Sequence, residues 1–420
     1  MRTIAIIGGG AAGLMTAASI IESGVEAEIH LFEKNPILGA KVIISGGGRC
    51  NVTTGITDRK LLLTKYTRGR EFIKTAIYDF PPEKVFEWFE EHGVPLKCED
   101  DLRVFPKSDH GKDVVGVFEK LFLEKKVDLH VKNPILTVEK VDGGFFLKAK
   151  SYQLKADVVV LTCGGEAYQH TGSTGDGYSF AKSCGHTVTR LGPSLSSFKT
   201  KETWPHKLSG ISFEKAKLKS EDGDGSTVEA TGPFLFTHFG ISGPVTFTLS
   251  SHLAFTAIDQ DNPRSIRVIP NADRGEQEWE KLLKQEFTQH GARLIITILD
   301  QFFPARFAEA ILELAQIPSD KKSAELSREE RQKIVKLLGE GLSLTLLQRR
   351  PGDEFVTAGG IPTTEVDSKT MQSKLCPGLF FAGEILNVDG ITGGFNLQWA
   401  WASGRRAGEA ILREGNSENA

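Results

Sequence analysis

A Gly-x-Gly-x-x-Gly motif directly behind an apolar, β-branched run is the sequence feature that most constrains the fold. Residues 3–7 (Thr-Ile-Ala-Ile-Ile) predict a strand buried on both faces, and Gly8, Gly10 and Gly13 follow it without a gap. The segment 14–23 then predicts a helix. A strand, a glycine turn and a helix in this order indicate the start of a parallel α/β sheet that binds a dinucleotide.

A second strand and an acidic residue complete this fingerprint. Residues 28–32 (Glu-Ile-His-Leu-Phe) predict the next strand, and Glu33 stands twenty residues after Gly13. We expect Gly8 to form the tight turn, Gly10 to admit the pyrophosphate, and Gly13 to allow close packing of helix on strand. Glu33 is expected to accept hydrogen bonds from a ribose 2′-hydroxyl, which disfavours a 2′-phosphate there. The fingerprint leaves NAD and FAD open.

The far end of the sequence carries another strand–acid–helix unit. Residues 378–384 (Gly-Leu-Phe-Phe-Ala-Gly-Glu) predict a buried strand that ends on a glycine and Glu384, and a helix begins near 393–396 and continues to about Leu412. We expect Glu384 to reach a ribityl chain. The helix start would face the flavin N1/O2 edge, where its dipole stabilises the negative charge of the reduced ring. The alternative is an ordinary packed helix without a binding role. Strand–acid–helix units at both ends of the chain favour FAD over NAD, because FAD is a large cofactor with two ends to hold.

Four sequence blocks together resemble one flavoprotein family. They are the opening fingerprint, 45–51 (Ser-Gly-Gly-Gly-Arg-Cys-Asn), 237–244 (Thr-His-Phe-Gly-Ile-Ser-Gly-Pro) and 393–401 (Gly-Gly-Phe-Asn-Leu-Gln-Trp-Ala-Trp). They are similar to the BaiN/RdsA family, also described as aminoacetone-oxidase-like FAD-binding enzymes, and they follow its order along almost the whole chain. The resemblance implies an α/β fold: a glutathione-reductase-like Rossmann FAD-binding domain with an inserted β-barrel-like plus helical domain.

The expected domain organisation is discontinuous, because the two cofactor-binding units lie at opposite ends of the sequence. Short β-like runs and turns change to helical patterns within the middle of the chain. The domains expected are an FAD-binding domain over 1–190 and 351–420, an inserted substrate or lid domain over 191–350 (β-rich over 191–272, helical over 273–350), and a disordered tail over 414–420.

Three consecutive glycines, 46–48, permit left-handed backbone and close approach, so we expect this loop against the flavin ring. The residues expected to bind the cofactor are Gly8, Gly10, Ala11, Ala12, Gly13, Glu33, Lys34, Lys41, Gly47, Gly48, Arg49, Cys50, Asn51, Gly164, Gly383, Glu384, Gly393, Gly394, Phe395 and Asn396.

Three residues are candidates for catalysis. By similarity to the family, Arg49 and Cys50 lie near the pyrimidine edge of the flavin; Arg49 can instead be a phosphate clamp or a structural ion pair. Cys50 could protonate a substrate carbon, or it could be a small buried filler. His238 has a useful pKa range, and a structural histidine is its alternative. No metal site is expected, because the five cysteines form no C-x-x-C pair.

Charge and hydropathy limit the partners. Lys+Arg 51 against Asp+Glu 54 excludes a protein-wide basic field, but residues 41–75 hold eight basic residues and two acidic ones. Residues 59–74 of this segment could contact the RNA backbone. The alternative is that these cations lie on a solvated helix face and contact the phosphates of FAD. The uncharged stretches 3–21 and 230–258 would form poor membrane-spanning helices, because glycines interrupt them. We therefore expect a cytoplasmic protein without membrane contact. Its oligomeric state stays open.

The function expected from these observations is that of an FAD-dependent oxidoreductase. No second dinucleotide fingerprint occurs in the sequence, so NAD(P)H is expected only as a transient ligand that supplies hydride through FAD to an activated C=C bond. A small molecule or RNA would be the substrate. The alternatives are a ribosomal-RNA dihydrouridine synthase that reduces the uracil C5=C6 bond, a flavin amine oxidase that uses O2, and a non-enzymatic redox sensor.

Overall fold

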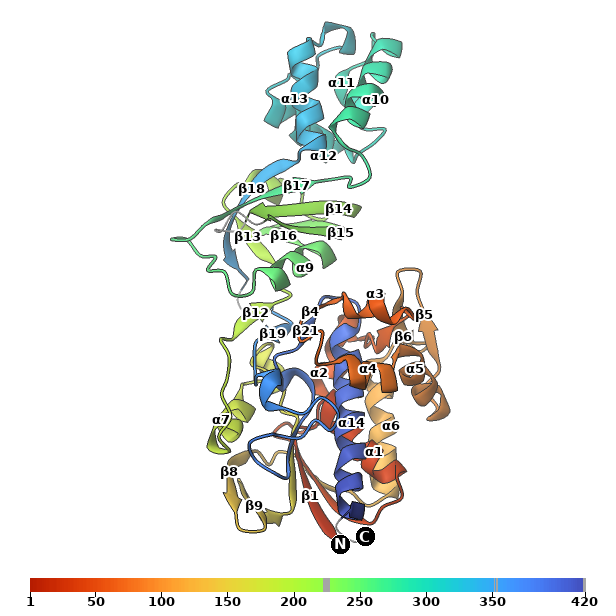
Figure 1. The fold of residues 1–420 in the computed structure, drawn as a ribbon. Helices are drawn as coiled ribbons and strands as arrows, with labels where there is room; N and C mark the ends of the chain where they lie inside the picture. Colours follow the sequence, from red (N-terminus) through yellow and green to blue (C-terminus); the bar gives the residue numbers. More distant parts are fainter. Residues whose placement is uncertain (222–226, 351, 353, 418–420) are drawn as a thin grey trace. The chain divides into compact units, whose positions relative to one another are not determined.

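The computed structural model describes residues 1–221, 227–350, 352 and 354–417, and the chain divides into two compact units (Figure 1). Unit 1 comprises Met1–Ser194 and Glu354–Ala420, and unit 2 comprises Leu195–Asp353. The boundaries therefore fall at 194/195 and 353/354, where the sequence suggested 190/191 and 350/351.

Unit 1 is built on a five-stranded sheet in the order β20-β11-β1-β2-β7, and all neighbouring strands are parallel. The strands are β1 (Arg2–Ile7), β2 (Ala27–Phe32), β7 (Asp128–His130), β11 (Val158–Leu161) and β20 (Leu379–Phe381). The side chains of β11 and β20 are fully buried, as expected for apolar strands of a parallel sheet that is covered on both faces. This order joins the two ends of the chain in one sheet.

Helices α1 (Ala11–Glu22) and α14 (Phe395–Ser417) pack side by side with α6 (Gly111–Glu124) in unit 1 (Figure 1). A Cβ on Gly404 would lie 2.4 Å from the Ala12 carbonyl oxygen, so α14 approaches α1 backbone to backbone. Helix α1 begins at Ala11, before the predicted start at residue 14, because Gly10 is its N-cap and Gly13 lies inside it. Residues 414–417 of the predicted tail belong to α14, which corrects that part of the prediction; 418–420 lie outside the described residues.

Shorter elements surround this framework. Four small sheets or ribbons are formed by β3 (Thr53–Thr54), β6 (Arg103–Pro106) and β5 (Leu96–Cys98); by β8 (Ile135–Val141), β9 (Gly144–Ala149) and β10 (Gln153–Ala156); by β4 (Tyr66–Arg68) and β21 (Asp389–Gly390); and by β12 (Gly192–Ser194) and β19 (Val356–Ala358). The remaining α-helices of unit 1 are α2 (Ala40–Ile44), α3 (Arg59–Leu63), α4 (Lys74–Asp79), α5 (Pro82–Glu91) and α7 (Asp176–Ser183).

Unit 2 contains a closed six-stranded barrel in the order β13-β16-β15-β14-β17-β18. Its strands are β13 (Phe198–Thr200), β14 (Ser212–Glu221), β15 (Thr227–Thr237), β16 (Gly240–Ser242), β17 (Arg264–Ile269) and β18 (Leu342–Arg349). Its helices are α8 (Trp204–Lys207), α9 (Pro244–His252), α10 (Glu276–Gln289), α11 (Ile295–Leu299), α12 (Ala305–Ala315) and α13 (Arg328–Gly339).

Strand β18 corrects the prediction that residues 273–350 are helical. Leu342, Leu344 and Leu346 are fully buried, while Ser343 between them is exposed. This period of two is the strand pattern, and pairing of β18 with β13 and β17 closes the barrel.

Within the described part of the chain, none of the helices combines the length and the apolar character that crossing a lipid bilayer requires.

Candidate dinucleotide site

The glycine turn after β1 has two crowded positions and one open position. A Cβ on Gly8, whose φ is +113°, would lie 2.5 Å from the Thr162 carbonyl oxygen, and one on Gly13 would lie 2.0 Å from the Gly8 carbonyl oxygen. A Cβ on Gly10 would meet nothing within 4 Å, and no side chain caps the N-terminus of α1 there. The N-terminus of α1, which includes Ala11 and Ala12, therefore has no side-chain cap and has open space beside Gly10, as a pyrophosphate site requires.

Glu33 lies at the carboxyl end of β2, beside this turn. Its Oε2 accepts a hydrogen bond from the Gly9 N–H (2.9 Å) and its Oε1 accepts one from the Asn35 N–H (2.8 Å). Burial raises the pKa of Glu33, and these two N–H donors oppose the shift by stabilising the charged form. Each carboxylate oxygen keeps acceptor capacity for a ribose hydroxyl.

A pocket with about 440 Å³ of empty space, open solvent included, adjoins Glu33. Lys34 on its wall is held by Asp176 (Nζ to Oδ2, 2.6 Å). Lys34 therefore forms an ion pair with a residue of the same chain, and the Asp176 carboxylate is partly exposed. The pocket is lined by Ile7, Gly8, Phe32, Glu33, Lys34, Asn133, Pro134, Ile135, Cys163, Gly172, Asp176 and Phe180.

Glu384 follows β20, so it lies beyond the carboxyl ends of the parallel strands, as Glu33 does after β2. Its Oε2 lies 2.8 Å from Lys41 Nζ, and its Oε1 accepts a hydrogen bond from the Thr357 N–H (2.8 Å). Gly383 has a φ of +81°, and a Cβ there would lie 2.8 Å from the Ala12 Cβ. The first turn of α1 therefore touches the residue before Glu384, although almost the whole chain separates them in sequence.

Thr357 is a residue at this edge that the sequence analysis missed. Its hydroxyl accepts hydrogen bonds from the Glu166 and Ala167 N–H groups (2.9 Å each), which shape the turn after β11. Gly164 in this turn has a φ of +71°, and a Cβ there would lie 3.0 Å from the Ser173 Oγ. No local pattern in the sequence marks Thr357, because its partners lie about 190 residues away.

The glycine loop predicted to face the flavin is exposed. Gly46, Gly47 and Gly48 have φ values of +57°, +73° and +90°, and a Cβ on Gly47 or Gly48 would meet nothing within 4 Å. L-residues rarely adopt these angles, so the loop needs glycine for its conformation. Its open side can accept a planar ring.

The start of α14 packs against the segment that follows this loop. A Cβ on Gly394 would lie 2.3 Å from the Thr53 carbonyl oxygen and 3.1 Å from the Asn51 Oδ1. Asn51 itself accepts a hydrogen bond from the Val104 N–H (3.2 Å), so its side chain is fixed between strands and helix. Gly393, with a φ of +132°, lies in the turn that leads into the helix.

Asn396 and Phe395 are committed to contacts within the protein. The Asn396 amide accepts from the Gly390 N–H and donates to the Gly390 carbonyl oxygen, both at 2.9 Å. Phe395 is buried, and its carbonyl oxygen accepts a hydrogen bond from the Tyr66 hydroxyl (2.9 Å). Their predicted contribution to cofactor binding therefore falls to backbone N–H groups at the helix start.

Arg49 lies in an ion-pair group on the β5–β6 ribbon. Its Nε donates to Asp109 (2.8 Å), another of its nitrogens donates to Glu99, and its guanidinium lies 3.8 Å from the Phe105 ring centroid. Lys97 also pairs with Asp109 (2.7 Å), and the Lys97 and Arg49 hydrogen bonds lower the pKa of that carboxyl. The roles left open for Arg49 were a catalytic group, a phosphate clamp and a structural ion pair, and this arrangement favours the structural ion pair.

Cys50 is fully buried and has a left-handed φ of +61°. Its N–H donates to the Ser45 carbonyl oxygen (2.9 Å), which closes the glycine loop. Burial raises the pKa of the Cys50 thiol to about 12, so the group is a neutral thiol at pH 7 and a poor nucleophile. Its position in the hydrophobic core of unit 1 favours the filler role.

His238 belongs to unit 2, where it is exposed in the turn between β15 and β16. Its ring contacts Phe239 edge-on at 5.0 Å, and the Thr237 hydroxyl fixes the turn by accepting from the Gly240 N–H (3.1 Å). Its catalytic role stays a prediction.

Three of the six cations of segment 59–74 are paired with carboxylates of unit 1. Arg59 makes two hydrogen bonds to Glu83, Arg68 makes two to Asp389, and Lys74 lies 2.5 Å from Glu71. Among the described residues, no carboxylate lies within ion-pair distance of Lys60 or Lys65. The pairing of Arg59, Arg68 and Lys74 favours the alternative without RNA contact, because it halves the number of cations open to an outside phosphate.

The chain is similar to proteins of known family and function. A family model described as "HI0933-like protein Rossmann domain" matches residues 2–410. The chain is 30% identical over 417 residues to the 3-dehydro-bile acid delta(4,6)-reductase of Clostridium scindens, covering 98% of this chain and 99% of that protein. It is 27% identical over 401 residues to the ribosomal RNA dihydrouridine synthase of Escherichia coli, covering 95% of each.

The fold is also similar to that of a solved structure, the 3-ketosteroid delta1-dehydrogenase from Sterolibacterium denitrificans in complex with 1,4-androstadiene-3,17-dione. The TM-score is 0.51 at 14% identity, and the match covers 99% of this chain and 100% of that one. These matches agree with the resemblance that the four sequence blocks carry, and with the predicted α/β fold.

Proposed function

The chain belongs to the HI0933-like protein family, and from this premise we propose that it is an FAD-dependent oxidoreductase that passes hydride from NAD(P)H through FAD to an activated carbon–carbon double bond. The observation that carries the proposal is the placement of Glu33 and Glu384 at one edge of the sheet, behind β2 and β20. Three strand spacings separate these strands, or about 14 Å at ~4.8 Å each. A dinucleotide laid across the α1 N-terminus extends over this distance.

Each part of this edge has a role in binding. The α1 N-terminus at Gly10 binds the pyrophosphate, Glu33 binds the adenosine ribose, and Glu384 binds ribityl hydroxyls with Lys41 as its counter-ion. Gly47 and Gly48, which have open space beside them, would hold the flavin ring. When bound, FAD supplies the two-electron chemistry between nicotinamide and alkene.

The α14 N-terminus would hold the pyrimidine edge of the flavin, where the helix dipole would stabilise negative charge. Cys50 keeps its proton at neutral pH, but its complete burial in the core of unit 1 favours packing over proton donation to a substrate carbon. Arg49, held by Glu99 and Asp109, fixes the loop that carries Cys50.

A small unsaturated molecule is the substrate class that we propose first. The names of the bile acid reductase and the dihydrouridine synthase both describe reductions, so the relatives alone do not separate small molecule from RNA. The internal pairing of Arg59, Arg68 and Lys74 supports the small molecule. Reduction of uracil in ribosomal RNA is the second candidate, supported by the similarity to the dihydrouridine synthase over 95% of both chains.

Anaerobic stopped-flow mixing tests the hydride donor. Protein reconstituted with FAD should lose its flavin absorbance on mixing with NADH or NADPH and regain it when an α,β-unsaturated steroid ketone is added. If the protein takes up FAD fully but the flavin does not bleach, NAD(P)H is not its hydride donor. If the protein does not take up FAD, the proposal that it is a flavoenzyme is wrong.

The RNA alternative has its own test. Dihydrouridine in ribosomal RNA is compared between cells with and without the gene, and cells carrying Lys60→Glu with Lys65→Glu serve as a third arm. These two lysines have no carboxylate partner among the described residues, so their reversal changes the surface without breaking an ion pair. Loss of dihydrouridine in the deletion strain, restored by the wild type and not by the double variant, would establish RNA as the substrate.

A further inference from the structure

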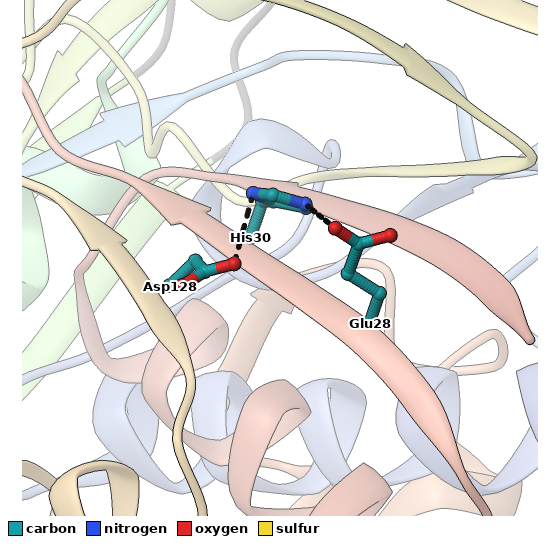
Figure 2. A group of neighbouring side chains, drawn as sticks. All are labelled: Glu28, His30 and Asp128. Atoms are coloured by element: carbon teal, nitrogen blue, oxygen red, sulfur yellow. Dashed lines mark hydrogen bonds and ion pairs between the residues drawn. The ribbon is translucent and has the colours of Figure 1, made fainter.

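A cluster of ligand-type side chains lies on one face of the sheet, at the β2–β7 edge. Residues alternate between faces along a strand, so Glu28 and His30 of β2 share a face. His30 is in register with Asp128 of β7, and Phe32 is in register with His130. Figure 2 shows Glu28, His30 and Asp128 converging from the two strands.

The two edges of the His30 ring have different partners. His30 Nδ1 lies 3.1 Å from His130 Nε2 and 3.7 Å from Asp128 Oδ2. His30 Nε2 lies 3.1 Å from Glu28 Oε1. One donor atom from each of Glu28, His30 and Asp128 lies within 4.8 Å of the others.

We propose that His30 Nδ1, His130 Nε2 and the Asp128 carboxylate bind a divalent transition metal ion such as Zn²⁺, with Glu28 as the group that orients His30. Two imidazoles and a carboxylate are the mixed nitrogen and oxygen donor set that zinc accepts. The cysteine spacing predicts no metal site, and no local pattern brings His30 and His130 together because they stand 100 residues apart in sequence.

The distances fit an ion between the histidines. A metal about 2.05 Å from both ring nitrogens would turn their separation of 3.1 Å into an N–metal–N angle of about 98°. This value lies between the octahedral and tetrahedral angles. Asp128 Oδ2 lies 3.7 Å from His30 Nδ1 on the same side of the ring, and Asp128 is 59% exposed, which gives the ion a path from solvent.

The surroundings hold both rings in place. His130 is stacked on Phe32 with ring centroids 4.4 Å apart, and its centroid lies 4.6 Å from that of Tyr152. His30 is 2% exposed, and Glu28 accepts from the ring nitrogen on its far edge, as carboxylates do behind metal-ligating histidines. Because the rings are fixed in advance, little reorganisation opposes binding.

Metal binding here would act on the adenosine end of the dinucleotide site. The Glu33 N–H donates to the His130 carbonyl oxygen (3.0 Å), and the Gly8 N–H donates to the Phe32 carbonyl oxygen (2.9 Å). An ion joining β2 to the edge strand β7 therefore fastens the strand ends that position Glu33.

Zinc titration of the full-length protein tests this site. Chelator-treated protein carrying Cys98→Ser, which removes an exposed thiol, is titrated with Zn²⁺ against a chromophoric chelator. We expect one ion per chain, and X-ray absorption should show nitrogen and oxygen ligands at about 2.0–2.1 Å. His130→Gln should weaken binding at least 100-fold, and Glu28→Gln should weaken it by about 10–100-fold.

Matched variants make the result decisive. His110→Gln changes an exposed histidine before α6 and should leave zinc affinity unchanged. Asp128→Asn changes an exposed side chain, so it tests the carboxylate even if a change at buried His30 impairs folding. Equal zinc affinity in His130→Gln and the parent, or no binding at micromolar zinc, would overturn the proposal and leave a hydrogen-bonded histidine pair only. Circular dichroism checks that each variant is folded.

Discussion

The Arg68 guanidinium makes two hydrogen bonds to the fully buried Asp389 carboxylate across 321 residues of sequence. The Ser194 hydroxyl donates to the same carboxylate (3.2 Å). The ion pair joins β4 to β21, and β21 is tied to the start of α14 by the Asn396 amide. A residue of the basic segment thus positions the helix end that we assign to the flavin.

Asp389→Asn should destabilise unit 1 strongly. The change removes the countercharge of Arg68, and breaking a buried ion pair in this way costs about 3–5 kcal/mol. Urea unfolding measures the loss of unfolding free energy. Arg59→Gln is the control, because the Arg59–Glu83 pair is 28% and 40% exposed and should contribute no more than about 1 kcal/mol. Equal losses in the two variants would contradict the prediction.

Gly10→Val and Gly13→Ala should separate cofactor binding from folding. Gly10 has extended backbone and open space beside it, so the valine should leave apoprotein stability nearly unchanged while filling the pyrophosphate position. At Gly13 a Cβ meets the Gly8 carbonyl oxygen at 2.0 Å, and such overpacking costs about 1–3 kcal/mol or more. Thermal unfolding and FAD titration measure the two effects. Retained FAD affinity in Gly10→Val would disprove the assigned pyrophosphate site.

Gly404→Ala should loosen the contact between α1 and α14. The added methyl would lie 2.4 Å from the Ala12 carbonyl oxygen, so we expect a loss of about 1–3 kcal/mol in urea unfolding. Gly116→Ala in α6 is a matched control, because a Cβ there meets nothing within 4 Å and alanine favours a helix by about 1 kcal/mol. Stabilisation by both alanines would show that the two helices are not in backbone contact.

Cys50 should make stability depend on pH in the alkaline range. Burial raises its pKa from the ordinary 9.0 to about 12, so the folded state holds the proton more tightly than the unfolded state. This contribution is fully present below pH 9 and is lost as pH rises toward 12, at up to about 1.4 kcal/mol per pH unit. Unfolding free energies of the wild type and Cys50→Ser should therefore diverge above pH 9. Parallel pH curves would place the thiol in contact with solvent.

Cys50→Ser also decides between the two roles of the thiol in turnover. The variant should keep its FAD, because neighbouring backbone and not the sulfur holds the loop. A slower flavin reoxidation by the unsaturated substrate, with unchanged reduction by NAD(P)H, would identify Cys50 as the proton donor. Unchanged rates in both half-reactions would leave it a packing residue.

The first βαβ unit was predictable because its signals are local. The apolar run, the glycine spacing and the acid stand within the first 33 residues, and β1 and β2 lie within a residue of the predicted bounds. The strand β18 was predicted wrongly, because Leu342–Arg349 follows a helical segment and its alternation is short. Only the pairing of this segment with β13 and β17 shows that it is a strand and not a continuation of the preceding helix.

The site shows the same division. Gly10, Glu33 and Glu384 could be predicted from sequence as cofactor-binding candidates, because a phosphate turn or a strand-end acid requires a residue type at a fixed local spacing. The partners of Arg49, Arg68 and His30 could not be assigned, since they lie 50, 321 and 100 residues away in the sequence.

By itself, the sequence determined the family, the dinucleotide fingerprint and the parallel sheet, because each depends on backbone requirements that neighbouring residues specify. Only the tertiary structure decided which cations are paired, that the Cys50 thiol is buried, and that His30 meets His130. Side-chain charge and protonation depend on neighbours brought together through space, and such neighbours leave no periodic pattern in the chain.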